Sequence, residues 1–194
     1  MTVTGLWSLL KKHKLIRNVI GADARELLEG KRVAIDVSMW IVQGTVIEQT
    51  GNTRKQHFLL TSFWRLCRYI RAGSFPVGVL EGACPSSKRR RRLDDSEFQQ
   101  NMILVANMFH LMGCPVIQAD GEAEGCCAQL SKNNLVEAIE SSDSDVFPFG
   151  ATGYILKTVS SNGTWEIEYV LVDEVWQSLG FCQHGLISLA LLSG

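Results

Sequence analysis

Four short runs of β-branched and other apolar residues, each followed by acidic residues, limit the folds open to this chain more than any other feature of its sequence. Their length and composition predict buried strands. Helical patterns separate them, and strands that alternate with helices are typical of an α/β fold with a mainly parallel sheet covered on both faces. The four runs are Lys31–Val37, Phe75–Leu80, Pro115–Ala119 and Val136–Ser141.

The rest of the chain fits the same architecture. With 194 residues, of which 46% are hydrophobic, it is long enough for one well-packed domain and short for two. Its apolar runs are too short to span a membrane, and its six cysteines, which form no C-x-x-C pair, suit reduced thiols. We expect helices at 4–12, 56–71, 96–112, 122–133, 173–179 and 184–193, and a hairpin over 154–169.

Acidic side chains stand where each of the four predicted strands ends. In a parallel sheet, ligand sites form beyond the carboxyl ends of the strands, so these acids are expected to meet at one edge. Like charges in contact raise one another's pKa and destabilise the fold unless a cation neutralises them. The acids are Asp36, Glu81, Glu122, Glu124, Asp143 and Asp145.

The chemistry of these six acids predicts a divalent-metal site. Oxygen ligands without His or Cys select Mg²⁺ or Mn²⁺ over Zn²⁺. Two pairs of acids and two single acids are about what two ions roughly 4 Å apart need, to clamp the attacking and leaving oxygens of a phosphodiester. Taken singly, an Asp after a strand is more often a helix cap or turn residue, whereas four strand ends together favour the metal site.

The charge of the chain is unevenly distributed. Its net charge is only −1, but residues 51–92 hold ten of the nineteen basic residues and a single acid, Glu81. Residues 93–168 hold twelve acids and only two basic residues, Lys132 and Lys157. This distribution fits a phosphate-binding surface beside a cation site, and it fits two oppositely charged solvated faces equally well.

Longer motifs around the acids resemble the flap-endonuclease/XPG family of structure-specific nucleases along essentially the whole chain. Glu81, and Trp40 four residues after Asp36, most resemble the GEN branch of Holliday-junction resolvases and their relatives. The resemblance implies the PIN-like, resolvase-like α/β nuclease core of that family. The motifs are those at residues 5–10, 33–40, 79–82, 121–130 and 142–150.

The resemblance also implies roles for individual residues. The six acids match the metal-binding carboxylates of the family, and Asp36, Glu122 and Asp143 would take part in catalysis. Lys88, seven residues after Glu81, matches the lysine at the foot of the family's helical arch. A basic side chain there would stabilise charge that develops on the transferring phosphoryl group.

Further basic residues are expected to bind the DNA backbone. Those after Lys88 extend its run, and the whole run could equally be a solvated charge run or a nuclear-localisation patch. DNA binding by this run is compatible with either of the other two interpretations. The further DNA-binding candidates are Arg89, Arg90, Arg91, Arg92, Arg54, Lys55, Arg65, Arg68 and Arg71.

These features predict a metal-dependent, structure-specific endonuclease that hydrolyses DNA at flaps, bubbles or four-way junctions during DNA repair and recombination. We expect two Mg²⁺ or Mn²⁺ ions, a nuclear location and no membrane association, and we leave dimerisation on junctions open. A PIN-type ribonuclease would share the acidic α/β site. It would have no reason to carry the motif at residues 121–130 or the run that begins at Lys88.

The end of the chain supports a second interpretation. Two family regions, at 1–92 and 110–194, would form a single nuclease domain over 1–194. By the resemblance, His184–Gly194 leads to the family's last metal-binding aspartate and to a helix-two-turn-helix, and the chain stops before both. An impaired form that binds metal and DNA is therefore the alternative. We also expect this end to fray and to expose Leu186, Ile187, Leu189 and Leu191.

Overall fold

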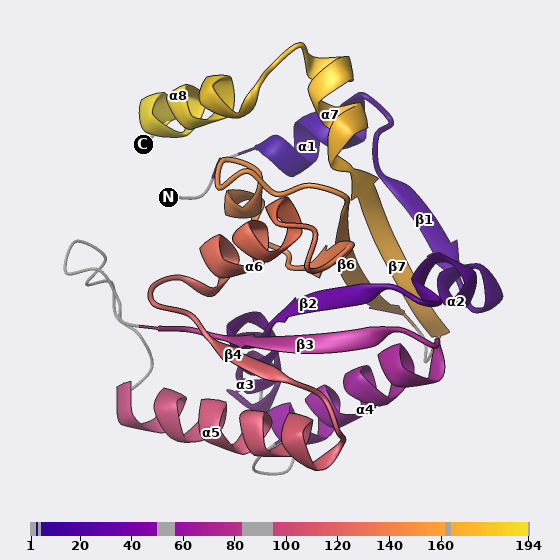
Figure 1. Cartoon of the computed structure of the whole chain (residues 1–194), viewed down its shortest axis with the longest axis vertical. Coiled ribbons are helices and arrows are strands. Elements are labelled where there is room, and N and C mark those ends of the chain that lie inside the picture. Colours follow the sequence, from indigo (N-terminus) through magenta and orange to yellow (C-terminus); the bar gives the residue numbers. More distant parts are fainter. Residues whose placement is uncertain (1–2, 4, 50–56, 83–94, 162–163, 194) are drawn as a thin grey trace.

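The computed structural model describes residues 3, 5–49, 57–82, 95–161 and 164–193. The strands in this part are β1 Arg17–Ile20, β2 Arg32–Asp36, β3 Phe75–Leu80, β4 Val116–Gln118, β5 Ala138–Glu140, β6 Tyr154–Ser161 and β7 Thr164–Leu171. They form one sheet in the order β1-β7-β6-β5-β2-β3-β4 (Figure 1). Every neighbouring pair is parallel except the two pairs made by β7. The mainly parallel α/β sheet predicted from the sequence is therefore confirmed.

Helices cover both faces of this sheet. They are α1 Leu6–Lys12, α2 Ala22–Leu28, α3 Val37–Gln49, α4 His57–Arg71, α5 Asp95–Leu111, α6 Ala123–Lys132, α7 Val172–Leu179 and α8 Gln183–Ser193. One core packs α2 to α5 against the sheet, and a second core packs α1, α6, α7 and α8 against it (Figure 1). Within the described residues, no helix combines the length and the apolar character that crossing a membrane requires.

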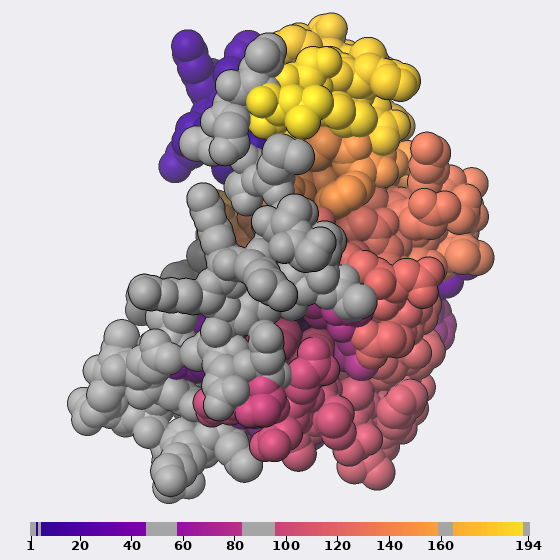
Figure 2. Space-filling model, turned by 90° about the vertical axis from the view of Figure 1, so that its left-hand side faces the viewer, coloured from indigo at the N-terminus to yellow at the C-terminus, as the bar shows by residue number. Residues whose placement is uncertain are grey.

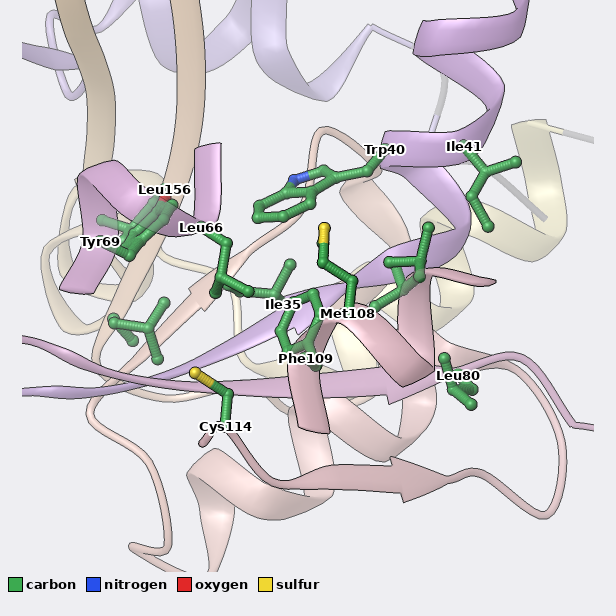
Figure 3. Close-up of a cluster of buried hydrophobic side chains, with 14 of the residues drawn as sticks. Ile35, Trp40, Ile41, Leu66, Tyr69, Leu80, Met108, Phe109, Cys114 and Leu156 are labelled. Carbon is green, nitrogen blue, oxygen red and sulfur yellow. The ribbon is translucent and has the colours of Figure 1, made fainter. Parts of the chain in front are cut away.

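Strand β2 shows why two layers form. Successive side chains of a strand point to opposite faces, so a strand buried on both faces is apolar throughout. Val33 and Ile35 lie in the core under α3 to α5, and Ala34 lies in the core under α6. Figure 3 shows the first of these cores, where Ile35 lies close to Phe109 and Leu66.

The structure adds three elements that the sequence patterns did not predict. Strand β1 pairs with β7 at an edge of the sheet, and most of its residues are exposed, so it has no apolar alternation to reveal it. Helix α2 is only seven residues long. Helix α3 begins at Val37, directly after Asp36, so the apolar run of β2 continues into the helix without a break.

Helix α8 corrects one expectation about the end of the chain. Leu186 is fully buried and Ala190 is 7% exposed, and both pack in the core that contains α6. Ile187, Leu189 and Leu191 are exposed, as expected. The helix is therefore docked through one side, because residues 186 and 190 are four apart and share a helical face.

Replacing Gly44 with Ala tests the contact between α3 and α4. A Cβ atom at Gly44 would lie 2.4 Å from both Cα and Cβ of Phe58, so the helices would have to move apart. We expect Gly44→Ala to lower the free energy of unfolding by about 1–3 kcal/mol in a denaturant titration. The matched control is Gly125→Ala in α6, where the nearest atoms lie 3.7 Å away. That change should be neutral or stabilising by roughly 0.5–1 kcal/mol, and equal losses in the two variants would contradict the prediction.

Candidate metal centre

The six predicted acids all lie at the carboxyl edge of four adjacent strands. Strands β5, β2, β3 and β4 are neighbours in that order. Asp36 is the last residue of β2, Glu81 follows β3, the Glu122 and Glu124 pair opens α6 after β4, and the Asp143 and Asp145 pair follows β5. Figure 2 views the molecule from this side, with α8 at the top and α5 at the bottom.

Asp36 lies at the centre of this group and is fully buried. Its Oδ1 accepts a hydrogen bond from the Ser38 hydroxyl at 2.6 Å and a longer one from the Met39 N–H at 3.4 Å. Its Oδ2 accepts from the Ser141 hydroxyl at 3.4 Å. Asp36 therefore caps the start of α3 and is also linked to the end of β5.

The Asp143 and Asp145 pair is held by the same serine. The Oγ atom of Ser141 accepts a hydrogen bond from the Asp143 N–H at 3.1 Å, and Asp143 Oδ1 accepts from the Asp145 N–H at 3.1 Å. Asp143 thus caps the 3₁₀ helix η2, Ser144–Val146. The two acids are two residues apart because the Asp145 N–H is the group that Asp143 caps. Asp145 itself is 5% exposed.

Glu81 is joined to the loop that carries the other pair. It is 6% exposed, and its Oε2 accepts a hydrogen bond from the Ala123 N–H at 3.2 Å. The Gly82 N–H donates to the Gly121 carbonyl at 2.7 Å. A Cβ atom at Gly82 would lie 2.0 Å from the Ala119 carbonyl oxygen, so only glycine permits this close approach. The start of α6 is therefore fixed against the end of β3.

Repulsion shows that four of these acids share one site. Burial raises the pKa of Glu124 to about 8, and the charges of Asp36, Glu81 and Asp143 add to the rise. Burial also raises the pKa of Asp36 to about 6, with further contributions from Glu81 and Asp143. Each of these acids comes from a different strand end, so the convergence at one edge does not depend on local sequence.

The donor set suits a hard divalent cation. All six side chains offer carboxylate oxygens, the ligands that Mg²⁺ and Mn²⁺ prefer. In the described part of the chain, no three His, Cys, Asp or Glu side chains are already arranged so that they could hold a metal ion. The acids are therefore gathered at one edge without being drawn into a chelating geometry, as expected where each repels the others.

The structure separates the predicted DNA-binding residues. Lys88 and the four arginines after it, together with Arg54 and Lys55, lie outside the described residues. The Arg65 guanidinium lies 5.7 Å from the centre of the Trp40 ring. Arg68 and Arg71 lie near the end of α4, which leads into the start of β3 (Figure 1). Together with residues of α2, they line a cavity of ≈680 Å³. These two arginines are therefore at the edge opposite the carboxylates.

Sequence reasoning missed the residues that orient the acids. Ser38 and Ser141 each donate a hydrogen bond to Asp36, yet a serine beside an aspartate is too common to stand out in one sequence. Glu140, the last residue of β5, was also missed as an acid of this region, although it is 5% exposed. Its signal was present, because an acidic residue inside an apolar run is unusual unless it is paired.

Two family models match the chain. The XPG N-terminal domain matches residues 1–101, which is more than half of the chain, and the XPG I-region matches residues 113–194. The chain belongs to the XPG family. Both matched regions contribute strands to the one sheet of this XPG-family chain, since β1 to β3 lie in the first and β4 to β7 in the second.

Named relatives agree with this family. "Flap endonuclease GEN-like 1" of Arabidopsis thaliana is 29% identical over 204 residues, covering 93% of this chain and 34% of the relative. The catalytic core of Rad2 in complex with a DNA substrate has a TM-score of 0.78 at 32% identity, covering 99% of this chain and 61% of that chain. The XPG-family chain spans about a third of the length of the plant GEN-like relatives it matches.

GEN1 structures share the fold. Human GEN1 in complex with Holliday junction DNA has a TM-score of 0.84 at 23% identity, covering 98% of this chain and 50% of that chain. GEN1 in complex with product DNA, Mg²⁺ and Mn²⁺ has a TM-score of 0.73 at 23% identity, covering 98% and 46%. The GEN-type relatives agree with the expected GEN branch of the XPG family, and the GEN1 structures confirm the expected α/β fold.

The metal-free chain should lose stability as the pH rises from about 5 to about 8. The folded-state pKa values of Asp36 and Glu124, about 6 and about 8, lie above the ordinary values of 3.8 and 4.5. The folded state therefore binds more protons in this window, and the stability present at low pH is lost as the pH rises through the folded-state pKa values. The measurement is the melting temperature against pH in EDTA.

Glu124→Gln removes one of these titrations and should flatten the curve between about pH 6 and pH 8. The control is Glu97→Gln in α5. Because Glu97 is exposed, this change should leave the slope of melting temperature against pH unchanged. A melting temperature that rises with pH over this range, or a Glu124→Gln curve as steep as the wild type, would show that the acids do not repel one another as described.

Proposed function

We propose that this chain carries the catalytic core of a structure-specific DNA endonuclease, which hydrolyses phosphodiesters at flaps or junctions with Mg²⁺ or Mn²⁺. The observation that carries the proposal is that buried Asp36 and Glu81 meet half-buried Glu124 and Asp143 in mutual repulsion at one sheet edge. A folded protein retains such a destabilising cluster only where the charges have a use. The DNA complexes of Rad2 and GEN1 support the choice of DNA as the substrate.

The residues present fit two divalent ions, and we propose all six acids as their ligands. Bound Mg²⁺ or Mn²⁺ would lower the pKa of an attacking water and neutralise charge on the phosphodiester. Ser38 and Ser141 would hold Asp36 in one orientation, and the Ala123 N–H would do the same for Glu81. Fixed carboxylates matter because a displacement of around 1 Å can cost on the order of a hundredfold in rate.

The substrate side of the proposal rests on the basic residues. Lys88 and the arginines that follow it come after Glu81, so the chain returns to the carboxylate edge just before this run begins. We propose that they contact the phosphates near the scissile bond, with Lys88 stabilising the transition state. Arg54 and Lys55 precede α4, whose start lies at the same edge. Arg68 and Arg71 would meet only DNA that reaches the opposite edge.

Nuclear location and dimerisation on junctions complete the proposal. The basic run at 88–92 resembles a nuclear-localisation patch, and a nuclear DNA substrate requires that location. A four-way junction has two symmetric strands to cut, so a dimer would suit it. Neither feature is needed for cleavage of a flap.

Cleavage of labelled DNA tests the proposal. The wild-type chain should cut a 5′-flap or a four-way junction in Mg²⁺ or Mn²⁺ and be inactive in EDTA. Asp36→Asn should lower the cleavage rate by on the order of a hundredfold, because it removes a central ligand and its charge. Exposed Glu97→Gln should cut like the wild type.

Three outcomes are informative. Cleavage that persists in EDTA or in Asp36→Asn would overturn the metal-centred mechanism. Binding of these DNA structures with no cleavage would favour the impaired, DNA- and metal-binding form. Cleavage of RNA in preference to both DNA structures would favour the ribonuclease interpretation.

A further inference from the structure

Glu140 is a buried acid outside the set of proposed metal ligands. It ends β5 and is only 5% exposed. Its neighbour Ile139 lies in the core under α6, so Glu140 points to the opposite face, toward α3 and α4. That face of the sheet is mainly apolar, and Figure 3 shows Trp40 pointing into it from α3 toward Leu66.

Two polar atoms in this region are buried without a protein hydrogen bond. Oε1 of Glu140 accepts a hydrogen bond from the Thr158 hydroxyl at 2.7 Å. Oε2 of Glu140 has no hydrogen-bond partner within the described residues, and neither has Nε1 of Trp40, whose side chain is 2% exposed. An acceptor and a donor left unpaired in the interior are costly, so an interaction between this acceptor and this donor is favoured.

These two side chains lie beside one small cavity. Its volume is ≈10 Å³, and Trp40, Glu140 and Thr158 all line it, together with Ser141. The Trp40 N–H is close enough to Glu140 to favour its charged form, so the two side chains interact directly.

Three elements converge on Glu140. Burial raises its pKa, while Arg65 of α4, Thr158 of β6 and the Trp40 N–H of α3 favour its charged form and oppose that rise. The Arg65 guanidinium also lies over the Trp40 ring, 5.7 Å from its centre. The carboxylate is therefore a shared contact of β6, α3 and α4 beneath the sheet edge.

The same network reaches two of the proposed metal ligands. Trp40 lies one helical turn after Asp36 on α3. Ser141, the residue after Glu140, donates to Asp36 Oδ2 and accepts from the Asp143 N–H. Any shift of α3 relative to β5 would therefore change the separation of Asp36 and Asp143.

We propose that Glu140 is a positioning residue of the metal centre, and that its contact with the Trp40 N–H fixes α3 against β5. The inference rests on the proposed metal-dependent function. Glu140 itself binds no metal and touches no DNA. It acts through the backbone that carries Asp36 and Asp143, as outer groups do when they orient metal ligands.

Mn²⁺ binding by the metal-free chain tests the positioning role. We expect Glu140→Leu, which is apolar and of similar size, to raise the Mn²⁺ dissociation constant about tenfold or more. Glu140→Gln keeps a hydrogen-bonding group and should lie close to the wild type. The matched control is Glu137→Leu, because Glu137 precedes the other end of β5 and pairs with Arg32. That change should leave Mn²⁺ affinity unaltered.

Thermal unfolding in EDTA tests the link without metal. Trp40→Phe removes the N–H and keeps a ring, so it should lower the melting temperature of the wild type. In the Glu140→Leu background the same change should have little further effect, because the partner is gone. If Glu140→Leu does not fold, Trp40→Phe alone should still weaken Mn²⁺ binding, and unchanged Mn²⁺ affinity in Trp40→Phe would overturn the positioning role.

The outcomes separate this inference from the proposed function. A wild-type chain that binds no Mn²⁺ would overturn both. Wild-type binding with equal affinity in Glu140→Leu would overturn the positioning role alone. Additive losses of melting temperature in the double variant would show that Trp40 and Glu140 are not linked.

Discussion

Mutual repulsion among carboxylates that are held out of water is the constraint on which the rest of this structure depends. Asp36 is fully buried, and the charges of Glu81, Glu124 and Asp143 act on it or on one another within the same edge of the sheet. Hydrogen bonds from serine hydroxyls and a helix N–H hold these groups but bring no positive charge. The fold therefore maintains a site whose negative charges a cation would neutralise, as we propose.

Packing of the two apolar cores against the parallel sheet keeps the acids together despite their repulsion. Parallel strands place all their carboxyl ends on one edge, and the two apolar cores on either face hold those strands in register. Short contacts then fix the loops: Gly82 donates to Gly121, and Ser141 joins β5 to β2. We propose that Glu140 and Trp40 add a further contact between β5 and α3 below the carboxyl edge. Ser141, next to Glu140, connects this contact to the carboxylates.

The main strands and the acids could be predicted because each depends on local pattern. Apolar runs that end in acid located β2 to β5, and parallel pairing then placed the acids together. The edge position of Arg68 and Arg71 depends on the direction in which α4 runs, which no local pattern reveals. The acidic residue Glu140 stands out inside an apolar run, but its contacts could not be predicted for a related reason, since its partners Thr158 and Arg65 come from distant segments.

Anomalous diffraction from crystals grown with Mn²⁺ tests the central claim most directly, because it locates the metal without reference to activity. The account predicts a Mn²⁺ peak at the carboxyl edge, bound by Asp36 and by carboxylates from at least two other strand ends. The same peak should be lost in Asp143→Asn or lie at lower occupancy. A fully occupied peak elsewhere on the chain, with this edge free of metal, would contradict the account.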